Sequence, residues 1–112
     1  MKRALTLTTA LIPLSLLVTQ ANANPLDGQV VAGAATINTN DPNWLLIQQK
    51  SKNAVIDWKT FNIGKNETTE FQLQDATGAT LNRVIGSQNP SLIEGMLKSN
   101  GTVMVINPDG IL

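Results

Sequence analysis

Beyond residue 23, short runs of apolar and β-branched residues alternate with clusters of Asn, Asp, Gly and Pro. Runs of about five residues bounded by such clusters are typical of β-strands joined by turns. Within residues 69–73, Thr, Phe and Leu fall on one face of a strand and Glu and Gln on the other. We therefore expect an all-β chain with strands over residues 29–33, 34–37, 44–49, 54–58, 60–63, 69–73, 79–85 and 102–106.

Residues 90–98 fit two patterns. Asn89, followed by a proline, would cap the start of a short helix. At a period of two residues, Ile93, Gly95 and Leu97 share one face of a strand instead. Because glycine weakens the interior of a helix, we favour the strand.

A turn is expected close to the end of the sequence. Asn107, Pro108, Asp109 and Gly110 suit the four successive positions of a type I turn, because proline presets φ at the second position. The turn follows the β-branched residues 102–106 and precedes two apolar residues that begin another run. This pattern predicts a further strand, and it indicates that the chain is the first part of a longer β-protein.

The spacing of the strands is compatible with a sandwich, a barrel or a β-solenoid. Strand centres recur every eight to twelve residues or so, without long aliphatic strands. Asparagine is abundant at the turns, where it tolerates a left-handed backbone and can stack between coils. An unfinished last strand is natural in a solenoid, since its stability is a sum over neighbouring coils. We therefore favour the solenoid.

The first residues have the pattern of a secretory signal. Residues 2–3 are basic, residues 4–18 are apolar apart from one proline and several hydroxyls, and Ala21 and Ala23 supply a small-x-small cleavage pattern. The apolar stretch is shorter than the roughly 20 residues that span a membrane. The sequence thus predicts a signal peptide for the Sec translocon, and signal peptidase as the enzyme that removes it.

Cleavage of residues 1–23 would leave Asn24 as the first residue of a mature domain, residues 24–112. The mature chain would keep six basic residues against eight acids, and the basic residues are dispersed. This charge pattern argues against nucleic acid as a partner.

The chain contains no histidine and no cysteine. It therefore lacks the commonest general base, the commonest nitrogen ligand for metals, and Ser-His or Cys-His catalysis. Asp27, Asp41, Asp57 and Asp75 are too scattered for a calcium loop. We expect neither an enzyme nor a cofactor.

Several blocks of the sequence, in order, resemble the N-terminal secretion domain of two-partner-secreted exoproteins. This family includes filamentous haemagglutinins, high-molecular-weight adhesins and haemolysins. The blocks are Gly28–Gly33, Ser51–Gly64 with its Trp, Phe and Gly, the Leu-Asn-Arg-Val segment 81–84, Ile93–Leu97, and the segment 100–111, which contains the turn usually written NPNG. Here Asp109 stands in place of the second asparagine, and either residue suits that position.

The resemblance implies a right-handed parallel β-helix with N-terminal capping strands, incomplete at its C-terminal end. It implies a secretion-targeting function: export through the periplasm, capture by the POTRA-type domains of an Omp85-type outer-membrane transporter, and nucleation of β-helix folding at the surface of a Gram-negative bacterium. The family's domain continues beyond the turn. An adhesin or haemolysin region, with any host glycan or receptor, would follow it.

The residues that would serve recognition or folding are Asn82 and Arg83, together with the turn Asn107, Pro108, Asp109 and Gly110. The turn is either a corner that holds the register of a coil or a direct contact for the transporter. Arg83 is expected to pair with Asp57 or Glu94 in a structural bridge, and contact with the transporter is the alternative.

Other functions remain open at this point. Trp44, Trp58, Phe61 and Phe71 are expected in the core, because aromatic residues at strand spacing usually pack there. Were they a solvent-facing stripe, the chain would instead be a carbohydrate- or receptor-binding adhesin fragment. A non-functional truncated remnant is a third reading.

Cleavage of the signal yields the first testable prediction. Mass spectrometry of exported material should show Asn24 as the N-terminal residue, because the small residues Ala21 and Ala23 precede it at the positions that signal peptidase reads. A soluble exported product that still begins with Met1 would contradict this prediction.

Overall fold

The computed structural model describes residues 24–112, so the predicted signal peptide and the cleavage residues Ala21 and Ala23 lie outside the described residues. The strands are β1 (Gln29–Ala32), β2 (Ala35–Asp41), β3 (Trp44–Gln49), β4 (Asn53–Trp58), β5 (Thr68–Gln72), β6 (Ala79–Val84), β7 (Met96–Ser99) and β8 (Thr102–Ile106). No helix occurs within the described residues. The all-β prediction is confirmed.

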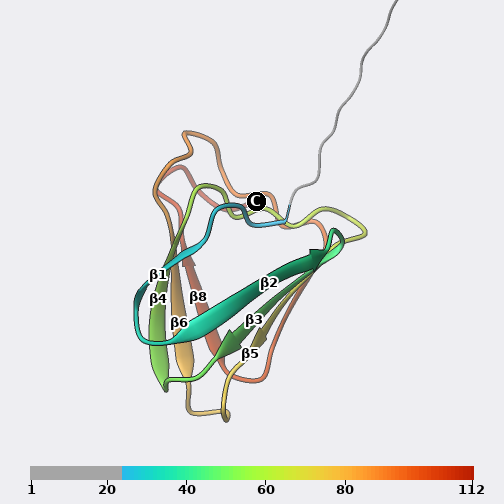
Figure 1. The fold of residues 1–112 in the computed structure, drawn as a ribbon. Helices are drawn as coiled ribbons and strands as arrows, with labels where there is room; N and C mark the ends of the chain where they lie inside the picture. The colour runs from blue at the N-terminus through green and yellow to red at the C-terminus, as the bar shows by residue number, and fades with distance from the viewer. Residues whose placement is uncertain (1–23) are drawn as a thin grey trace, which may run out of the picture.

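The strands form two four-stranded sheets, ordered β1-β4-β6-β8 and β2-β3-β5-β7. Strands β3, β5 and β7 are parallel to one another, and so are β4, β6 and β8. The chain thus winds through both sheets in every coil. Figure 1 shows the two sheets opening from each other like a V, with loop segments crossing the open side.

Bridges on the open side give the coils a third, short side. Ile63 pairs in parallel with Ile93, and Ser91 pairs in parallel with Ile111. Because Trp44 is in register with Thr68, and Thr68 with Met96, the first coil takes 24 residues and the second 28. The fold is therefore a three-sided β-helix.

The first two strands run against this pattern. β1 pairs antiparallel with β4, and β2 pairs antiparallel with β3. They extend both sheets beyond the first coil and cover its end, as capping strands do. β2 is longer than the sequence suggested, because pairing with β3 continues through Asn38 and resumes at Asp41 after a bulge. Of the polar residues between the two expected strands, residues 38–41 belong to β2 and residues 42–43 form the turn.

One expectation on the third side was wrong and another is confirmed. Residues 60–63 form isolated bridges rather than a strand. Residues 90–98 are extended, as favoured over a helix: bridges at Ser91 and Ile93 lead into β7. A Cβ on Gly95 would lie 2.0 Å from the Gly64 carbonyl oxygen, so the two coils touch here through their backbones.

The core lies between the sheets. Trp58, Phe61 and Phe71 are buried there, with Trp58 and Phe61 edge-to-face at 5.8 Å between ring centroids and Phe61 stacked on Phe71 at 6.4 Å. The prediction of a core position was wrong for Trp44, which is 41% exposed on the outer face. Its position alternates with buried Leu45, so the pleat of β3 directs it outward.

The contact at Gly95 generates a prediction about coil stacking. Gly95→Ala should lower the free energy of unfolding by about 1–3 kcal/mol, because the added methyl meets two backbone carbonyls that cannot move independently of their coil. Gly86→Ala is the matched control, since its Cβ would lie 3.3 Å from the flexible Lys59 side chain. Denaturant unfolding of both variants measures the difference, and equal midpoints would contradict the close packing of the coils.

Candidate recognition and folding site

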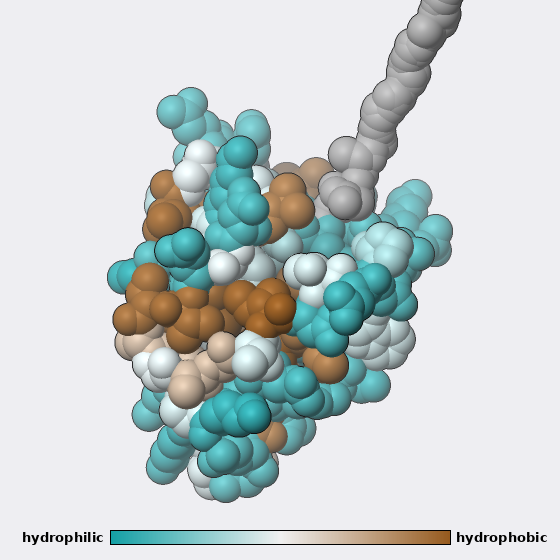
Figure 2. Space-filling view, viewed as in Figure 1, coloured by the Kyte–Doolittle hydropathy of each residue, from teal (hydrophilic) through white to brown (hydrophobic). Residues whose placement is uncertain are grey.

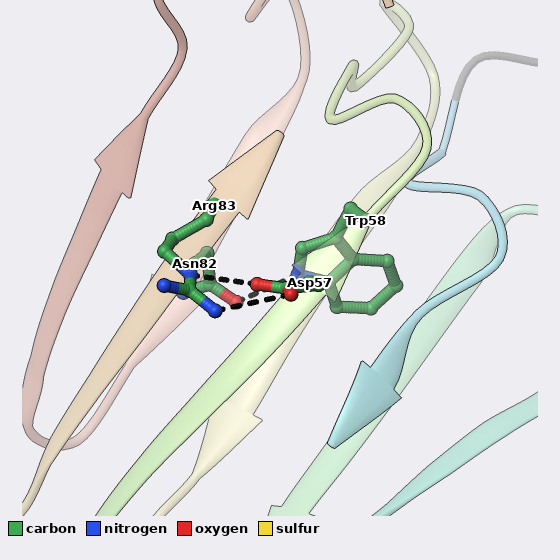
Figure 3. A network of polar contacts seen from close by, with 4 residues as sticks. All are labelled: Asp57, Trp58, Asn82 and Arg83. Carbon is green, nitrogen blue, oxygen red and sulfur yellow. Dashed lines mark hydrogen bonds and ion pairs between the residues drawn. The ribbon is translucent and has the colours of Figure 1, made fainter. Parts of the chain in front are cut away.

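Asn82 lies at the centre of the inner face of β6 and is fully buried. Its side-chain oxygen accepts a hydrogen bond from the Trp58 indole N–H at 2.8 Å, and its side-chain NH₂ donates to the Met104 carbonyl at 3.2 Å. Trp58 belongs to β4 and Met104 to β8, so one amide ties the strands on either side of β6. Figure 3 shows the indole and the amide side by side.

Trp58 extends this connection to the cap. A Cβ on Gly28 would lie 2.5 Å from a carbon of the indole ring, so only glycine allows the chain to pass so close. Gly28 and Trp58, which lie in two of the blocks that resemble the secretion-domain family, therefore pack against each other. A series of contacts therefore leads from the cap to the third coil: Gly28 contacts Trp58, Trp58 bonds to Asn82, and Asn82 bonds to Met104.

Arg83 points to the opposite face because side chains alternate along a strand. Its Nε and Nη2 groups donate to the two carboxylate oxygens of Asp57, at 2.7 and 3.0 Å. The structure thus selects Asp57, and not Glu94, as the partner of Arg83. These hydrogen bonds and the nearby negative charge raise the pKa of the guanidinium above its ordinary value. The Arg83 side chain is 45% exposed and that of Asp57 is 14% exposed.

The predicted turn is present at Asn107–Gly110. The Gly110 amide donates to the Asn107 carbonyl at 3.0 Å, and the Asp109 amide donates to the Asn107 side-chain oxygen at 2.9 Å. Gly110 has φ +101°, which favours glycine. A Cβ there would meet nothing within 4 Å, so the position is restricted by backbone conformation and not by space.

Asn107 also holds the turn against the preceding coil. Its NH₂ group donates to the Asn89 carbonyl at 3.0 Å and to the Ser91 hydroxyl at 3.1 Å. The Ser91 amide donates to the Gly110 carbonyl at 2.9 Å. Asp109, in contrast, projects into solvent.

The structure brings the two predicted groups of residues to the same end of one sheet. Arg83 is in register with Ile106, the residue before the turn. Among the six candidates, Asn82, Asn107 and Arg83 bond to a neighbouring coil, Arg83 from the outer face of the sheet, whereas Asp109 is exposed. Inward-facing and outward-facing positions are therefore divided among the members of the motif.

Sequence reasoning missed two further amides that stack the coils. Gln49 is buried, and its NH₂ donates to the carbonyls of Ser51, Lys52 and Ala79 at 2.9–3.0 Å. It also accepts from the Thr80 hydroxyl. The phase of β3 could have revealed it, because Gln49 follows buried Leu45 and Ile47 at steps of two.

Asn100 is the second missed amide. Its side chain accepts from the Leu73 amide and donates to the Leu73 carbonyl, both at 2.8 Å. It thus mimics one more strand partner at the turn that precedes β8. Local sequence gives no signal for this contact, because Leu73 belongs to the preceding coil.

Asn24, the predicted first residue after cleavage, is part of the fold. It is 8% exposed, and its side-chain oxygen accepts from the Thr69 hydroxyl at 3.2 Å. Within residues 24–112, no group of three or more His, Cys, Asp or Glu side chains could hold a metal ion. In the same part of the chain, no helix is long and apolar enough to cross a membrane.

These features define a class of protein: a short β-helix with an antiparallel cap, whose sequence motifs serve the stacking of coils. Residues 21–112 match the protein-family model described as TPS secretion domain, where TPS stands for two-partner secretion. The chain belongs to this family.

Similar proteins come from Haemophilus influenzae. Two heme/hemopexin-binding proteins, one of them from strain Rd, are 41% and 38% identical over 88 residues. These alignments cover 79% of this chain but only 10% and 9% of the relatives. The chain thus spans about a tenth of the length of the curated relatives it matches.

A solved structure shows the same fold. The crystal structure of the HMW1 secretion domain from Haemophilus influenzae superposes with a TM-score of 0.72 at 40% sequence identity, over 79% of this chain and 23% of that one. The β-helix architecture is therefore confirmed. The names of these proteins refer to binding and secretion and not to catalysis.

Because Asn82 is buried and the adjacent Arg83 is exposed, substitutions at the two positions should affect stability differently. Asn82→Leu should cost about 2–4 kcal/mol, because the Trp58 indole N–H and the Met104 carbonyl lose their buried partner. Arg83→Gln is the neighbouring control and should cost less than Asn82→Leu, since the arginine side of its ion pair is 45% exposed. The measurement is denaturant unfolding followed by tryptophan fluorescence; a larger loss for the arginine variant would reverse the assignment.

Proposed function

We propose that this chain is the secretion-targeting module of an exoprotein, and that it directs the exoprotein to a dedicated Omp85-type outer-membrane transporter. The observation that carries the proposal is the match of residues 21–112 to the two-partner secretion family, together with its known structural relative. The named relatives are far longer than this chain, which agrees with a targeting module at the start of a large exoprotein.

The proposed route begins with the Sec translocon and signal peptidase, which would release the domain into the periplasm after residue 23. There the unfolded or partly folded chain would meet the POTRA-type domains of the transporter. β-Augmentation is the contact that suits it, because an extended segment can add to a sheet edge through main-chain hydrogen bonds. The exoprotein would then be secreted or held at the cell surface of a Gram-negative bacterium.

Folding of the β-helix would follow at the cell surface and would nucleate the rest of the exoprotein. The side-chain amides that bond from one coil to the next support this part of the proposal. Asn82 and Asn107 gain their partners only when successive coils stack, so each added coil completes hydrogen bonds of the previous one. No cofactor or nucleotide is needed, because each coil also buries apolar surface.

The adhesin alternative receives less support. Of the four aromatic residues considered for a carbohydrate-binding stripe, Trp58, Phe61 and Phe71 are buried, and only Trp44 faces solvent. The binding of heme and hemopexin is a property that the names of the relatives give to proteins about ten times the matched length. Targeting therefore remains the function that the geometry supports best.

Export tests the proposal directly. In a full-length homologous exoprotein, Gly110→Val at the equivalent turn should reduce secretion, because a β-branched residue fits poorly at φ +101°. Asp109→Asn should leave secretion unchanged or improve it, since Asn suits the same turn position. The readout is the ratio of secreted to periplasmic protein, with the transporter present and absent.

Two outcomes separate the parts of the proposal. Export of the wild-type exoprotein without the transporter would refute targeting altogether. Normal transporter-dependent export of the valine variant would show that the turn is incidental, and would place recognition at Asn82 and Arg83 or in the opening strands.

A further inference from the structure

Asn100 and Gly101 form the corner between β7 and β8, and they are the single Asn-Gly pair of the sequence. In such a pair the backbone nitrogen of the glycine can attack the side-chain carbon Cγ of the asparagine, because glycine has no side chain to shield its nitrogen. Asparagine is among the thermolabile residues of proteins. The corner thus contains both reacting groups of a spontaneous modification.

The stacking of the coils requires both residues of this pair. A Cβ on Gly101 would lie 2.7 Å from a side-chain carbon of Leu73 and 2.9 Å from the Gly78 carbonyl oxygen, so the corner has no room for a larger residue. The Asn100 side chain supplies one acceptor and one donor to the Leu73 backbone, both at 2.8 Å. An ionised aspartate in its place would supply no donor for the Leu73 carbonyl. The fold therefore retains a reactive pair.

The folded structure keeps the reacting groups in other interactions. The oxygen and the nitrogen of the Asn100 amide are both bound to Leu73 in the preceding coil, which fixes the side chain there. The Gly101 amide, which would be the nucleophile, donates to the Ser99 hydroxyl oxygen at 3.0 Å. Attack on Cγ therefore needs a local opening that breaks these bonds, and its rate is limited by the population of the open state.

Burial does not explain this protection, because the corner is accessible to water. Asn100 is exposed and Gly101 is half-buried. Figure 2 shows hydrophilic residues covering the lower end of the molecule, where Figure 1 places the corners that join the two sheets. Protection of the pair therefore comes from the hydrogen bonds that hold Asn100 and the Gly101 amide.

We propose that Asn100-Gly101 is a site of self-modification, and that stacking of the third coil on the second suppresses the reaction. In the unfolded chain, the Gly101 nitrogen bonds to Cγ of Asn100, the bond from Cγ to Nδ2 breaks, and Nδ2 leaves as ammonia with the proton of the Gly101 amide. Water then opens the cyclic imide at either carbonyl, which gives aspartate or isoaspartate at position 100. The net reaction consumes one water and releases one ammonia.

The modification damages the corner at which it occurs. A carboxylate at position 100 has no donor for the Leu73 carbonyl and places a negatively charged oxygen beside it. Isoaspartate also adds one carbon atom to the main chain, at a corner where Gly101 is already in close contact with the preceding coil. The third coil of a modified chain therefore stacks poorly.

The reaction thus marks chains that have stayed unfolded. Under the proposed function these are chains that have waited for export, and this consequence rests on that function. The chemistry of the corner does not rest on it, because both states of the chain can be compared without a transporter.

The first experiment incubates the exported chain at mildly alkaline pH, either folded in buffer or unfolded in guanidinium chloride. Peptide mapping by mass spectrometry follows each asparagine, because replacement of NH₂ by OH changes the mass whereas isomerisation of an Asp-Gly pair does not. Asn100 should react more slowly in the folded chain by about tenfold or more. Asn107 is the internal control and should stay intact in both states, since the nitrogen of Pro108 carries no hydrogen.

Two variants test the restraint and the damage separately. Ser99→Ala should raise the folded-state rate at Asn100 about threefold, because the Gly101 amide loses its acceptor, and should leave the unfolded-state rate unchanged. Asn100→Asp reproduces one product and should raise the equilibrium constant of unfolding about tenfold. Asn66→Asp is the matched control, because it adds the same charge at an exposed position of the turn before β5. Failure of Asn100→Asp alone to fold is the same result in a stronger form.

Three outcomes would overturn the proposal. Equal rates at Asn100 in the folded and unfolded chains would remove the protection, and an unfolded-state rate no higher than that of Asn66 would remove the site. Equal stability of Asn100→Asp and Asn66→Asp would remove the effect on coil stacking. None of these measurements involves the transporter, so the targeting proposal is decided by the secretion assay alone.

Discussion

The stacking of three strands across the Asn82 amide is the constraint on which the rest of the structure depends. Trp58, Asn82 and the Met104 carbonyl lie on β4, β6 and β8; the Trp58 indole donates to the Asn82 side-chain oxygen, and the Asn82 NH₂ group donates to the Met104 carbonyl. An unpaired amide or indole N–H inside this small core would cost a large fraction of the stability of a domain of this size. The inner hydrogen bonds therefore set the register, and the apolar side chains around them fill the coil.

Side chains on the outer faces of the two sheets also link neighbouring coils, through weaker interactions. On β3, β5 and β7, the Trp44 indole donates to Glu70 at 3.2 Å, and the Lys98 ammonium lies 5.6 Å from the centroid of the Trp44 ring. Arg83 and Asp57 make the corresponding link between β6 and β4. Trp58 thus joins coils in the interior of the β-helix, and Trp44 joins them on its outer face.

Local chemistry made some elements predictable. The turn at Asn107–Gly110 could be recognised because its residue preferences act within four residues, and the observed hydrogen bond from the Gly110 amide to the Asn107 carbonyl is the expected one. The extension of β2 through Asn38 and Asp41 could not be recognised, because polar residues became a strand only by pairing with β3. Residues 60–63 have the composition of a strand, but they form only isolated bridges, because strand formation depends on pairing that the local sequence does not reveal.

The sequence by itself determined the all-β class, most strand positions, the family, and the set of motif residues, since periodicity, turn chemistry and motif order are properties of neighbouring positions. Only the tertiary structure decided which motif members are buried and which are exposed. Asn82 and Arg83 are adjacent, yet the pleat sends one to Trp58 and the other to Asp57. Trp58 lies 24 residues from Asn82, and Asp57 lies 26 residues from Arg83, which is the length of one coil. That length is fixed by how the sheets stack and not by any local pattern.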